Sequence, residues 1–287
     1  MPRYSLAHSP DADDLFMVAP LMLGIIKSQG MTFEAHALDI QTLNDEALKG
    51  TFDITAISFA LYPLIAQEYA LLRTQASFGE GYGPKLVKRR GEHLKRRFKV
   101  ALSGRHTTNA LLFKIRYPDA KIVYKNFLEI EGAILSGEVD AGILIHEAIL
   151  TYSDALEVEG EVWQWWQELV GKELPLPLGG MVLRRSIPLM RAIEIEELLT
   201  KAVNASQTHR HEIAASLAKE GKLRIDGEKL ERYLQMYANE RSACLDEVSM
   251  EALDYLWRIG WEKGFYPIPI KTVDYLIPTD YHELRKG

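Results

Sequence analysis

Short apolar runs alternate with stretches of helical periodicity along the first 150 residues of the chain. The apolar runs have the length and composition of buried strands, and they cover residues 4–7, 33–38, 52–57, 98–102, 121–124 and 140–145. The stretches that follow them repeat apolar residues at every third or fourth position, and they cover residues 14–26, 42–48, 61–69, 107–117, 129–135 and 147–150. This alternation predicts an α/β fold with mostly parallel sheets covered by helices.

Two segments rich in glycine and proline, residues 79–90 and 175–185, interrupt the alternation. Each is a turn that leads into a brief apolar strand with basic residues at its end. Because they bracket a segment of near-domain size, we predict two lobes joined by a hinge, with a ligand site in the cleft between them. Lobe one would comprise residues 1–87 and 181–287, and lobe two residues 88–180. The alternative is two ordinary loops within one sheet.

The last hundred residues form a helical tail, which we expect on the outside of lobe one. Helical periodicity covers residues 189–204, 209–220, 227–238 and 247–263. Gly221 and Gly264 follow two of these stretches, at positions where glycine often ends a helix. Trp257 and Trp261 are four residues apart and share one helix face, so we interpret both as core packing.

Composition and charge exclude several classes of protein. With 287 residues, 47% of them hydrophobic, the chain can form about two domains with full cores. The net charge of −6 argues against a nucleic-acid surface, which usually needs a basic excess. Basic residues do cluster at 85–97, and we interpret them as a solvated surface, with an anion-attracting rim as the alternative.

The single cysteine, Cys244, rules out an internal disulfide. It falls in an amphipathic stretch over residues 243–256, where we expect it to be a small core residue. The N-terminal residues lack the pattern of a secretory signal, and no stretch approaches the roughly 20 apolar residues of a membrane span. We therefore expect a cytoplasmic protein without a membrane partner; the sequence leaves the oligomeric state open.

Candidate chemistry lies where strands lead into helices, because ligands of open α/β sheets bind outside the carboxyl ends of the strands. The first such junction, residues 8–14, contains Ser9, Asp11, Asp13 and Asp14. We interpret Ser9 or Asp11 as a helix cap, with the acidic residues favoured by the positive helix end. Mg²⁺ binding is the alternative, and it is the weaker one because no second acidic motif completes a site.

Two further junctions carry small polar residues. The third strand ends with Ala56, Ile57 and Ser58, whose hydroxyl can either donate to a ligand or cap a helix. Asn44 follows the second strand in the same way. Thr107 and Thr108 open a helix after a tight turn at residue 104, which suits binding of a carboxylate or phosphate; helix capping alone explains one threonine better than two.

The fourth junction places His146 and Glu147 at the end of a six-residue apolar run. Imidazole titrates near neutral pH, so a histidine in the cleft suits proton transfer. A structural or exposed histidine is the alternative. Glu147 can orient the ring or begin the next helix.

Seven segments, in this order, resemble the menaquinone-biosynthesis family of 1,4-dihydroxy-6-naphthoate synthases. They are residues 8–16, 39–44, 57–58, 81–84, 107–108, 140–147 and 174–180. The most specific are Asp-Ala-Gly-Ile-Leu-Ile-His-Glu at 140–147 and Leu-Pro-Leu-Pro-Leu-Gly-Gly at 174–180. The resemblance covers most of the first 185 residues, and the helical tail adds little to it.

The resemblance implies a fold like that of type II periplasmic binding proteins. It also implies a lyase that converts cyclic dehypoxanthine futalosine to 1,4-dihydroxy-6-naphthoate without a metal or redox cofactor. His146 would be the proton acceptor. The substrate, a small carboxylate, would contact Asn44, the 56–58 strand end and the pair of threonines at 107 and 108.

The chain departs from the family pattern at one junction. Many relatives carry Ser-Pro-Cys-Pro-Asn-Asp where this chain has Ser-Pro-Asp-Ala-Asp-Asp at 9–14, which leaves open whether Ser9, Asp11 and Asp14 contact the ligand. Two other functions share the fold: chorismate dehydratase of the same pathway, and a non-catalytic solute-binding protein. The position of His146 and Glu147 favours the lyase over both.

Overall fold

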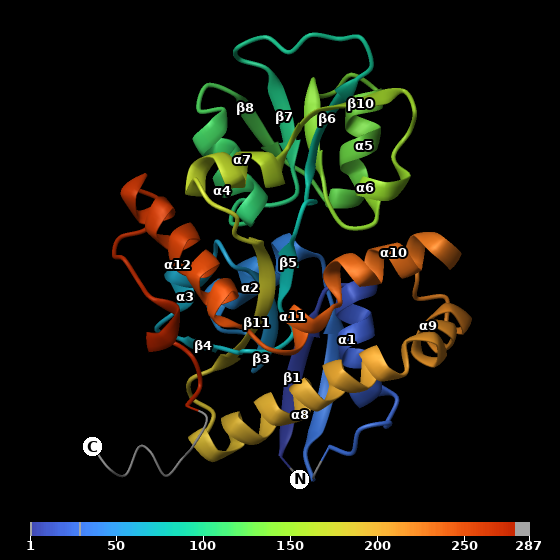
Figure 1. The fold of residues 1–287 in the computed structure, drawn as a ribbon, viewed down its shortest axis with the longest axis vertical. Helices are drawn as coiled ribbons and strands as arrows, with labels where there is room; N and C mark the ends of the chain where they lie inside the picture. The colour runs from blue at the N-terminus through green and yellow to red at the C-terminus, as the bar shows by residue number, and fades with distance from the viewer. Residues whose placement is uncertain (1, 29, 279–287) are drawn as a thin grey trace.

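The computed structural model describes residues 2–28 and 30–278 and shows two lobes, each built on its own sheet (Figure 1). Lobe one is built on a six-stranded sheet in the order β2-β1-β3-β11-β4, with β5 paired to β11. Its strands are β1 (Arg3–His8), β2 (Thr32–Ala37), β3 (Ile54–Ser58), β4 (Tyr69–Leu71), β5 (Ser77–Gly79) and β11 (Leu176–Arg184). Lobe two is built on a five-stranded sheet in the order β10-β6-β9-β7-β8. Its strands are β6 (Lys85–Arg89), β7 (Lys99–Leu102), β8 (Lys121–Tyr124), β9 (Ala141–Leu144) and β10 (Leu156–Glu161).

Helices cover both sheets and continue into the C-terminal tail. Those before the tail are α1 (Ala12–Met22), α2 (Ile40–Lys49), α3 (Tyr62–Ile65), α4 (Thr108–Arg116), α5 (Phe127–Leu135), α6 (Ala148–Thr151) and α7 (Val162–Val170). The tail contains α8 (Leu189–Thr208), α9 (Arg210–Lys219), α10 (Gly227–Tyr237), α11 (Glu240–Ala243), α12 (Glu247–Glu262) and the short 3-10 helix η1 (Thr272–Asp274). Among the residues that the structure describes, no helix is long and apolar enough to cross a membrane.

Local sequence explains where the elements begin and end. The carboxylate of Asp39 accepts hydrogen bonds from the backbone N–H groups of Gln41 and Thr42, which caps α2. That helix ends at Gly50, whose φ of 67° lies in the left-handed region that glycine tolerates. Gly221 and Gly264 have φ values of 67° and 78°, so the predicted stops at both positions are confirmed.

The alternation of strands and helices is confirmed, but the prediction of mostly parallel sheets is wrong. The βα units give parallel pairs, β1 with β2 and β3, and β7 with β8 and β9. β11 runs antiparallel to β3, β4 and β5, and β6 runs antiparallel to β9 and β10. β6 and β11 are the strands that directly follow the two crossings between the lobes. Each enters its sheet from the end opposite to the one where the strands of the βα units begin, and this makes both sheets mixed.

The helix expected over residues 61–69 is also wrong. Only the four residues of α3 are helical, and Tyr69 already begins β4. Val182 of β11 pairs with Leu71 and buries the short apolar strand, so tertiary pairing overrides the helical pattern. β10, α7 and α11 are elements that the sequence analysis did not propose.

The chain crosses between the sheets at residues 80–84 and 171–175. Both crossings lie slightly before the boundaries expected at 87 and 180, because β6 and β11 belong entirely to the sheets they enter.

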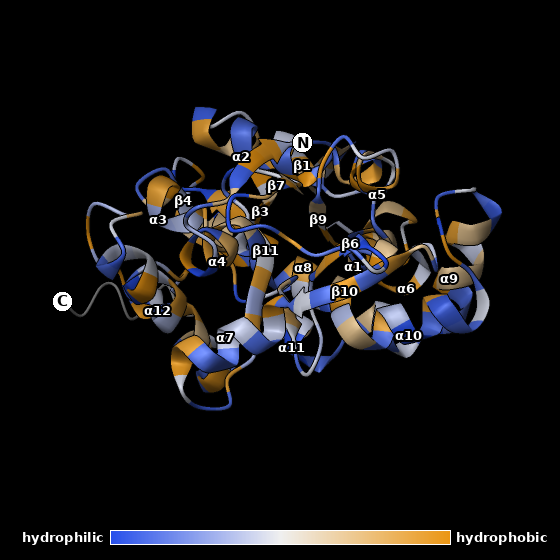
Figure 2. Ribbon diagram, turned by 90° about the horizontal axis from the view of Figure 1, so that it is seen from above, coloured by the Kyte–Doolittle hydropathy of each residue, from blue (hydrophilic) through white to orange (hydrophobic). Residues whose placement is uncertain are grey.

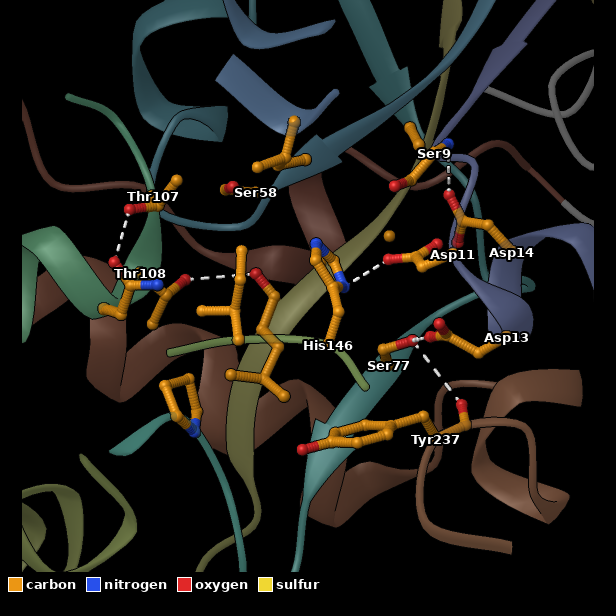
Figure 3. A pocket seen from close by; sticks show the side chains of 18 of the residues that line it. Ser9, Asp11, Asp13, Asp14, Ser58, Ser77, Thr107, Thr108, His146 and Tyr237 are labelled. Atoms are coloured by element: carbon orange, nitrogen blue, oxygen red, sulfur yellow. Dashed lines mark hydrogen bonds and ion pairs between the residues drawn. The ribbon is translucent and has the colours of Figure 1, made fainter. Parts of the chain in front are cut away.

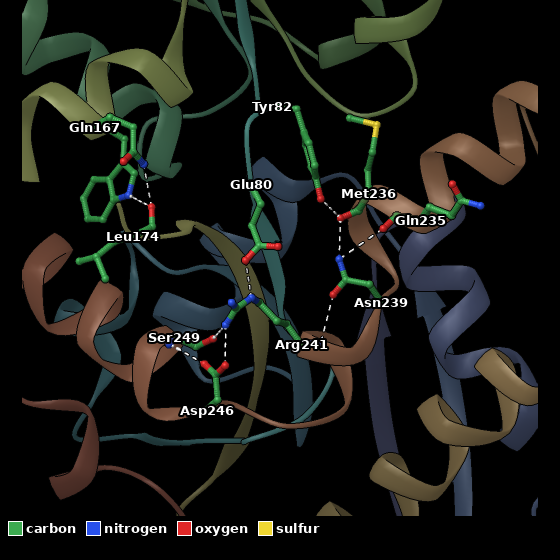
Figure 4. A network of polar contacts seen from close by, with 11 residues as sticks. Glu80, Tyr82, Gln167, Leu174, Gln235, Met236, Asn239, Arg241, Asp246 and Ser249 are labelled. Atoms are coloured by element: carbon green, nitrogen blue, oxygen red, sulfur yellow. Dashed lines mark hydrogen bonds and ion pairs between the residues drawn. The ribbon is translucent and has the colours of Figure 1, made fainter. Parts of the chain in front are cut away.

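The two crossings are anchored on different lobes (Figure 4). Arg241 of the tail pairs with Glu80 of the first crossing at 2.5 Å, and the hydroxyl of Tyr82 donates to the backbone carbonyl of Met236. At the second crossing, the carbonyl of Leu174 accepts hydrogen bonds from Trp166 and Gln167 of α7, in lobe two. The first crossing is therefore held by the tail, and the second by lobe two.

The tail packs on lobe one, and it also reaches toward the cleft. Helices α8, α9 and α10 contact α1, and α12 contacts β11. In α10 the side chains of Leu230, Tyr233 and Leu234 are buried while Lys229 and Arg232 are exposed. The ribbon of this helix accordingly carries both hydrophobic and hydrophilic segments in Figure 2. The prediction of a C-terminal helical tail is confirmed, but its placement only on the outside of lobe one is incomplete.

The exposure of three side chains tests the prediction that each is a core residue. Trp257 is fully buried, its Nε1 donates to the carbonyl of Phe59 at 2.9 Å, and its ring stacks on Tyr62. Trp261 is 42% exposed, so its assignment to the core is wrong. Cys244 is exposed and follows α11 before α12 begins, so it is neither helical nor a core residue. The amphipathic helix begins at Glu247, as the periodicity over residues 247–263 predicts, and Asp246 caps it by accepting a hydrogen bond from the backbone N–H of Ser249.

The basic residues of β6 are paired with carboxylates. Lys85 lies 4.0 Å from Glu161, and Lys88 lies 2.6 Å from Glu159; both partners are in the antiparallel neighbour β10. Arg89 pairs with Glu92 in the adjacent turn. These pairs neutralise the positive charge locally and disfavour the anion-attracting rim.

Candidate active site in the interlobe pocket

A pocket of about 740 Å³, including its open mouth, lies between the two lobes. Its walls combine strand ends of both sheets with residues of α10 (Figure 3). The lining residues are Ser9, Asp11, Asp13, Asp14, Ile40, Ala56, Ile57, Ser58, Ser77, Pro84, Thr107, Thr108, Asn109, Ile145, His146, Leu178, Gly179, Gly180, Tyr233 and Tyr237.

The four junctions singled out in the sequence meet at this pocket. Ser9, Asp11, Asp14, Ala56, Ile57, Ser58, Thr107, Thr108 and His146 all line it. They come together because β1 and β3 of lobe one, and β7 and β9 of lobe two, direct their carboxyl ends toward the same cleft.

Asn44, a predicted substrate contact, does not line the pocket. It is fully buried in α2, where its side-chain amide donates to the Ser58 hydroxyl at 3.1 Å and its Oδ1 accepts from the Ser58 backbone N–H at 3.0 Å. Asn44 therefore lies behind Ser58 and holds both its backbone and its side chain.

The start of α4 presents a helix N-terminus to the pocket. Thr107 caps this helix: its hydroxyl oxygen accepts from the backbone N–H of Ala110 at 3.3 Å and lies 2.7 Å from Oδ1 of Asn109. The hydroxyl of Thr108 donates to the carbonyl of Leu178 at 3.2 Å. Both hydroxyls thus have protein partners, while the backbone N–H groups of the first helical turn have no partner within the helix and suit an anionic group.

His146 follows β9 and lies at the centre of the pocket. Its backbone φ of 53° is in the left-handed region, which is uncommon for residues other than glycine and is often retained at functional sites. Nδ1 contacts the carboxylate of Asp11, and the edge of the ring packs against Phe127 with centroids 4.9 Å apart. Nε2 has no protein partner among the described residues.

The carboxylates around His146 control its protonation. Burial by itself lowers the pKa of His146, but Asp11, Asp13 and Glu147 outweigh it and raise that pKa to about 9. In turn, burial favours the neutral form of Asp11, while the positive ring of His146 and the more distant Arg224 lower the pKa of its carboxyl overall. The contact therefore favours an ionised pair.

The expected capping at residues 9–14 does not occur. Asp11 occupies the N-cap position of α1, yet its side chain makes no cap hydrogen bond because it turns toward His146. Glu147, which belongs to lobe two, accepts from the backbone N–H of Ala12 at 3.0 Å instead. Ser9 does not cap the helix either; its backbone N–H donates to Asp14 at 2.7 Å.

Asp13 lies beneath the pair formed by Asp11 and His146. Its two carboxylate oxygens accept from Ser77 at 2.9 Å and from the Tyr233 hydroxyl at 3.0 Å. Burial, together with the charge of Asp11, raises the pKa of Asp13 to about 7. Burial and both neighbouring aspartates also hold the pKa of Asp14 well above its usual value.

One atom each from Asp11, Asp13 and His146 lies within 4.8 Å of the others, a spacing at which three side chains could share a cation. In the structure, the ring nitrogen and the Asp11 carboxylate contact each other directly, and Asp13 accepts two hydrogen bonds. Among the described residues, these three groups are held by hydrogen bonds and an ion pair.

Several lining residues lie outside the predicted site. Ser77, Tyr233 and Tyr237 carry no local signal beyond burial, since only tertiary packing brings β5 and α10 to the cleft. Gly179 and Gly180 lie within the proline-rich motif at 174–180, and their role follows from space. A Cβ at Gly179 would lie 2.8 Å from the carbonyl oxygen of Ile57, and one at Gly180 would lie 2.6 Å from the Phe59 ring. Glycine thus allows β11 to approach the end of β3 closely.

A family model described as menaquinone biosynthesis matches residues 4–262 of this chain. The 1,4-dihydroxy-6-naphtoate synthase of Thermus thermophilus is 30% identical over 267 residues, which cover 92% of this chain and 96% of that protein. The protein of the same name from Streptomyces coelicolor is 28% identical over 269 residues, which cover 91% of this chain and 94% of that protein.

Solved structures extend the similarity to the fold. Protein AF1704 from Archaeoglobus fulgidus has a TM-score of 0.85 and 33% identity, covering 91% of this chain and 98% of its own. The alkanesulfonate-binding protein SsuA from Xanthomonas axonopodis pv. citri has a TM-score of 0.71 and 12% identity, covering 96% and 98%. At 12% identity the second match concerns the fold alone. These matches confirm the predicted fold, two lobes arranged as in periplasmic binding proteins.

Proposed function

The chain belongs to the menaquinone biosynthesis family, and on that premise we propose that it is a carbon–carbon lyase that converts cyclic dehypoxanthine futalosine to 1,4-dihydroxy-6-naphthoate. The observation that carries this proposal is His146, which lines a pocket between the lobes together with the N-terminus of α4 and whose buried Nε2 has no protein partner among the described residues. A base and an anion-binding helix end are the two groups that the reaction needs.

Cleavage of a carbon–carbon bond beside a hydroxyl group starts with loss of the hydroxyl proton. His146 would accept this proton on Nε2, and the hydroxyl oxygen would become a carbonyl oxygen as the carbon–carbon bond breaks. The electron pair of that bond would pass to the fused-ring fragment, where it would be held as the negative charge of an enolate oxygen until that oxygen is reprotonated. The backbone N–H groups at the start of α4 would stabilise either that charge or the substrate carboxylate. Formation of the aromatic naphthoate would make the cleavage favourable.

The remaining lining residues would orient the substrate. Ile40, Ile145 and Leu178 offer apolar surface for a fused ring, and the 56–58 strand end offers backbone groups and the Ser58 hydroxyl. We assign Asn44 to holding Ser58 rather than to direct contact, because both of its amide atoms bond that residue. The two crossings between the lobes would act as a hinge, and closure would exclude water from the reaction.

Product formation tests this function directly. Purified protein incubated with cyclic dehypoxanthine futalosine should release 1,4-dihydroxy-6-naphthoate, detected by its absorbance and mass. Release of product without added metal or redox cofactor is the expected result. Conversion of chorismate instead would assign the protein to the dehydratase reaction of the same pathway, and tight binding of the futalosine compound without turnover would assign it to solute binding.

Thr107→Val should mainly weaken substrate binding. The substitution keeps the shape of the side chain but removes the hydroxyl that caps α4 and holds Asn109, so the first helical turn would no longer present its N–H groups in order. We expect substrate affinity to fall about tenfold, which corresponds to a lost cap and hydrogen bond. Isothermal titration of a catalytically inactive background measures it. Thr107→Ser, which retains the hydroxyl, should bind as the wild type does; equal affinity in both variants would contradict the assignment.

The activity should rise with pH through the neutral range. Because the pKa of His146 is raised to about 9, its ring is mostly protonated at pH 7 and only a minor neutral fraction can accept a proton. We expect kcat/KM, which reports the free enzyme, to increase about tenfold per pH unit and to level off near pH 9. A pH–rate profile measures this limb. A profile that is already flat from pH 6 to 8 would contradict the role of His146 as the base.

A further inference from the structure

Asp11 and His146 form a contact that spans the cleft. Asp11 lies at the start of α1 in lobe one, and His146 follows β9 in lobe two. Only 3% of the Asp11 side chain and 17% of the His146 side chain are exposed, and the Asp11 carboxylate contacts Nδ1 directly. The two groups can meet only when the lobes are as close as they are in this structure.

The contact determines which ring nitrogen faces the substrate. A carboxylate accepts hydrogen bonds, so Nδ1 must carry a hydrogen, and in the neutral ring Nε2 is then the nitrogen with a free electron pair. Nε2 lacks a protein partner among the described residues, and the ring edge away from Asp11 turns toward the interior of the pocket (Figure 3). The arrangement is that of a histidine base oriented by a carboxylate.

The neighbouring groups leave Asp11 available for this contact. Glu147, in lobe two, accepts a hydrogen bond from the backbone N–H of Ala12. The Asp11 carboxylate, in the N-cap position, therefore need not cap α1. The other charged groups near the ring have partners of their own: Asp13 is held by Ser77 and Tyr233, Asp14 by the Ser9 backbone, and Glu147 lies 3.5 Å from Arg224. Asp11 is therefore the carboxylate that bonds the ring itself.

We propose that Asp11 is a positioning residue that holds His146 with its hydrogen on Nδ1 and its Nε2 toward the substrate, and that closure of the lobes assembles this pair. The proposal rests on the lyase function above for its kinetic consequence, but not for the contact itself.

Asp11→Asn tests the proposal, because it preserves shape and removes the charge. We expect kcat to fall about 10²-fold while KM changes by less than about threefold, and we expect the acidic limb of the kcat/KM profile to move to lower pH. Asp119→Asn is the matched control: it makes the same chemical change in an exposed ion pair with Arg96, and its kinetics should equal those of the wild type.

A spectroscopic measurement tests the contact independently of activity, and its first part needs only the wild-type protein. Spectra of wild-type protein labelled with nitrogen-15 histidine should show, above the pKa of His146, a hydrogen on Nδ1 and none on Nε2. In Asp11→Asn the pKa of His146 should drop by at least about one unit. If both spectral results hold but no naphthoate forms, the pair stands and the proposed function fails.

Three results would overturn the proposal. One is a wild-type ring with its hydrogen on Nε2. Another is an Asp11→Asn protein with unchanged kcat and an unchanged pKa of His146. The third is wild-type activity that a chelator abolishes and Mn²⁺ restores, which would place a cation between Asp11, Asp13 and His146 instead.

Discussion

His146→Ala should lower turnover at least about 10²-fold while substrate still binds, because the variant loses the base but keeps the binding surface. The N-terminus of α4 and the end of β3 do not depend on the imidazole for their hydrogen bonds. The loss should therefore appear in kcat, with KM changed by less than about threefold. Steady-state kinetics with cyclic dehypoxanthine futalosine measure both constants.

Removal of His146 also leaves the buried Asp11 carboxylate without its partner, which can destabilise the protein. Control variants must therefore separate a loss of stability from a loss of the catalytic base. His146→Gln offers a polar group of similar reach but cannot act as a base, so it should be as inactive as His146→Ala. Added imidazole should restore part of the activity of His146→Ala by entering the vacated space. His209→Ala, at an exposed position in the helical tail, should retain full activity. Wild-type turnover in His146→Gln would remove His146 from the mechanism.

The sequence could predict the βα framework because each unit carries its own local signals. β1, β3, β7 and β9 are short, largely apolar runs, and each is followed by a short turn that leads into a helix. Parallel strands place these turns at one edge of each sheet, so junctions far apart in the chain converge without any contact having to be predicted. The candidate residues other than Asn44 and Glu147 line the pocket for this reason.

The pairing of side chains across the cleft could not be predicted in the same way. Asp11 has the sequence context of a helix cap. Its side chain instead forms an ion pair with His146, 135 positions away in the sequence. Glu147 then supplies the cap from the other lobe. Likewise, the amphipathic pattern of α10 shows that Tyr233 and Tyr237 are buried, but not that they are buried against the pocket. These choices depend on tertiary geometry, which helical or strand periodicity does not encode.

The two tryptophans of α12 also differ in a way that helical periodicity does not predict. Their difference in burial leads to the second prediction, a large loss of stability. Trp257 and Trp261 lie one helical turn apart, yet one is fully buried and the other is 42% exposed. Trp257 stacks on Tyr62 at 5.3 Å and donates to the carbonyl of Phe59, the residue that follows Ser58. Its indole therefore supports the strand end that lines the pocket, in addition to filling the core.

Trp257→Ala should lower the free energy of unfolding by about 3–5 kcal/mol, because it opens a large cavity and leaves the Phe59 carbonyl without its donor. Trp261→Ala is the matched control on the same helix, and its change should stay within about 0.5 kcal/mol because its ring is largely solvated. Urea denaturation followed by circular dichroism measures both. Since Phe59 follows Ser58 directly, Trp257→Phe should keep most of the stability but bind substrate less tightly, as the ring remains and the N–H donor is lost. Equal stability losses in the two alanine variants would show that α12 does not pack against lobe one as described.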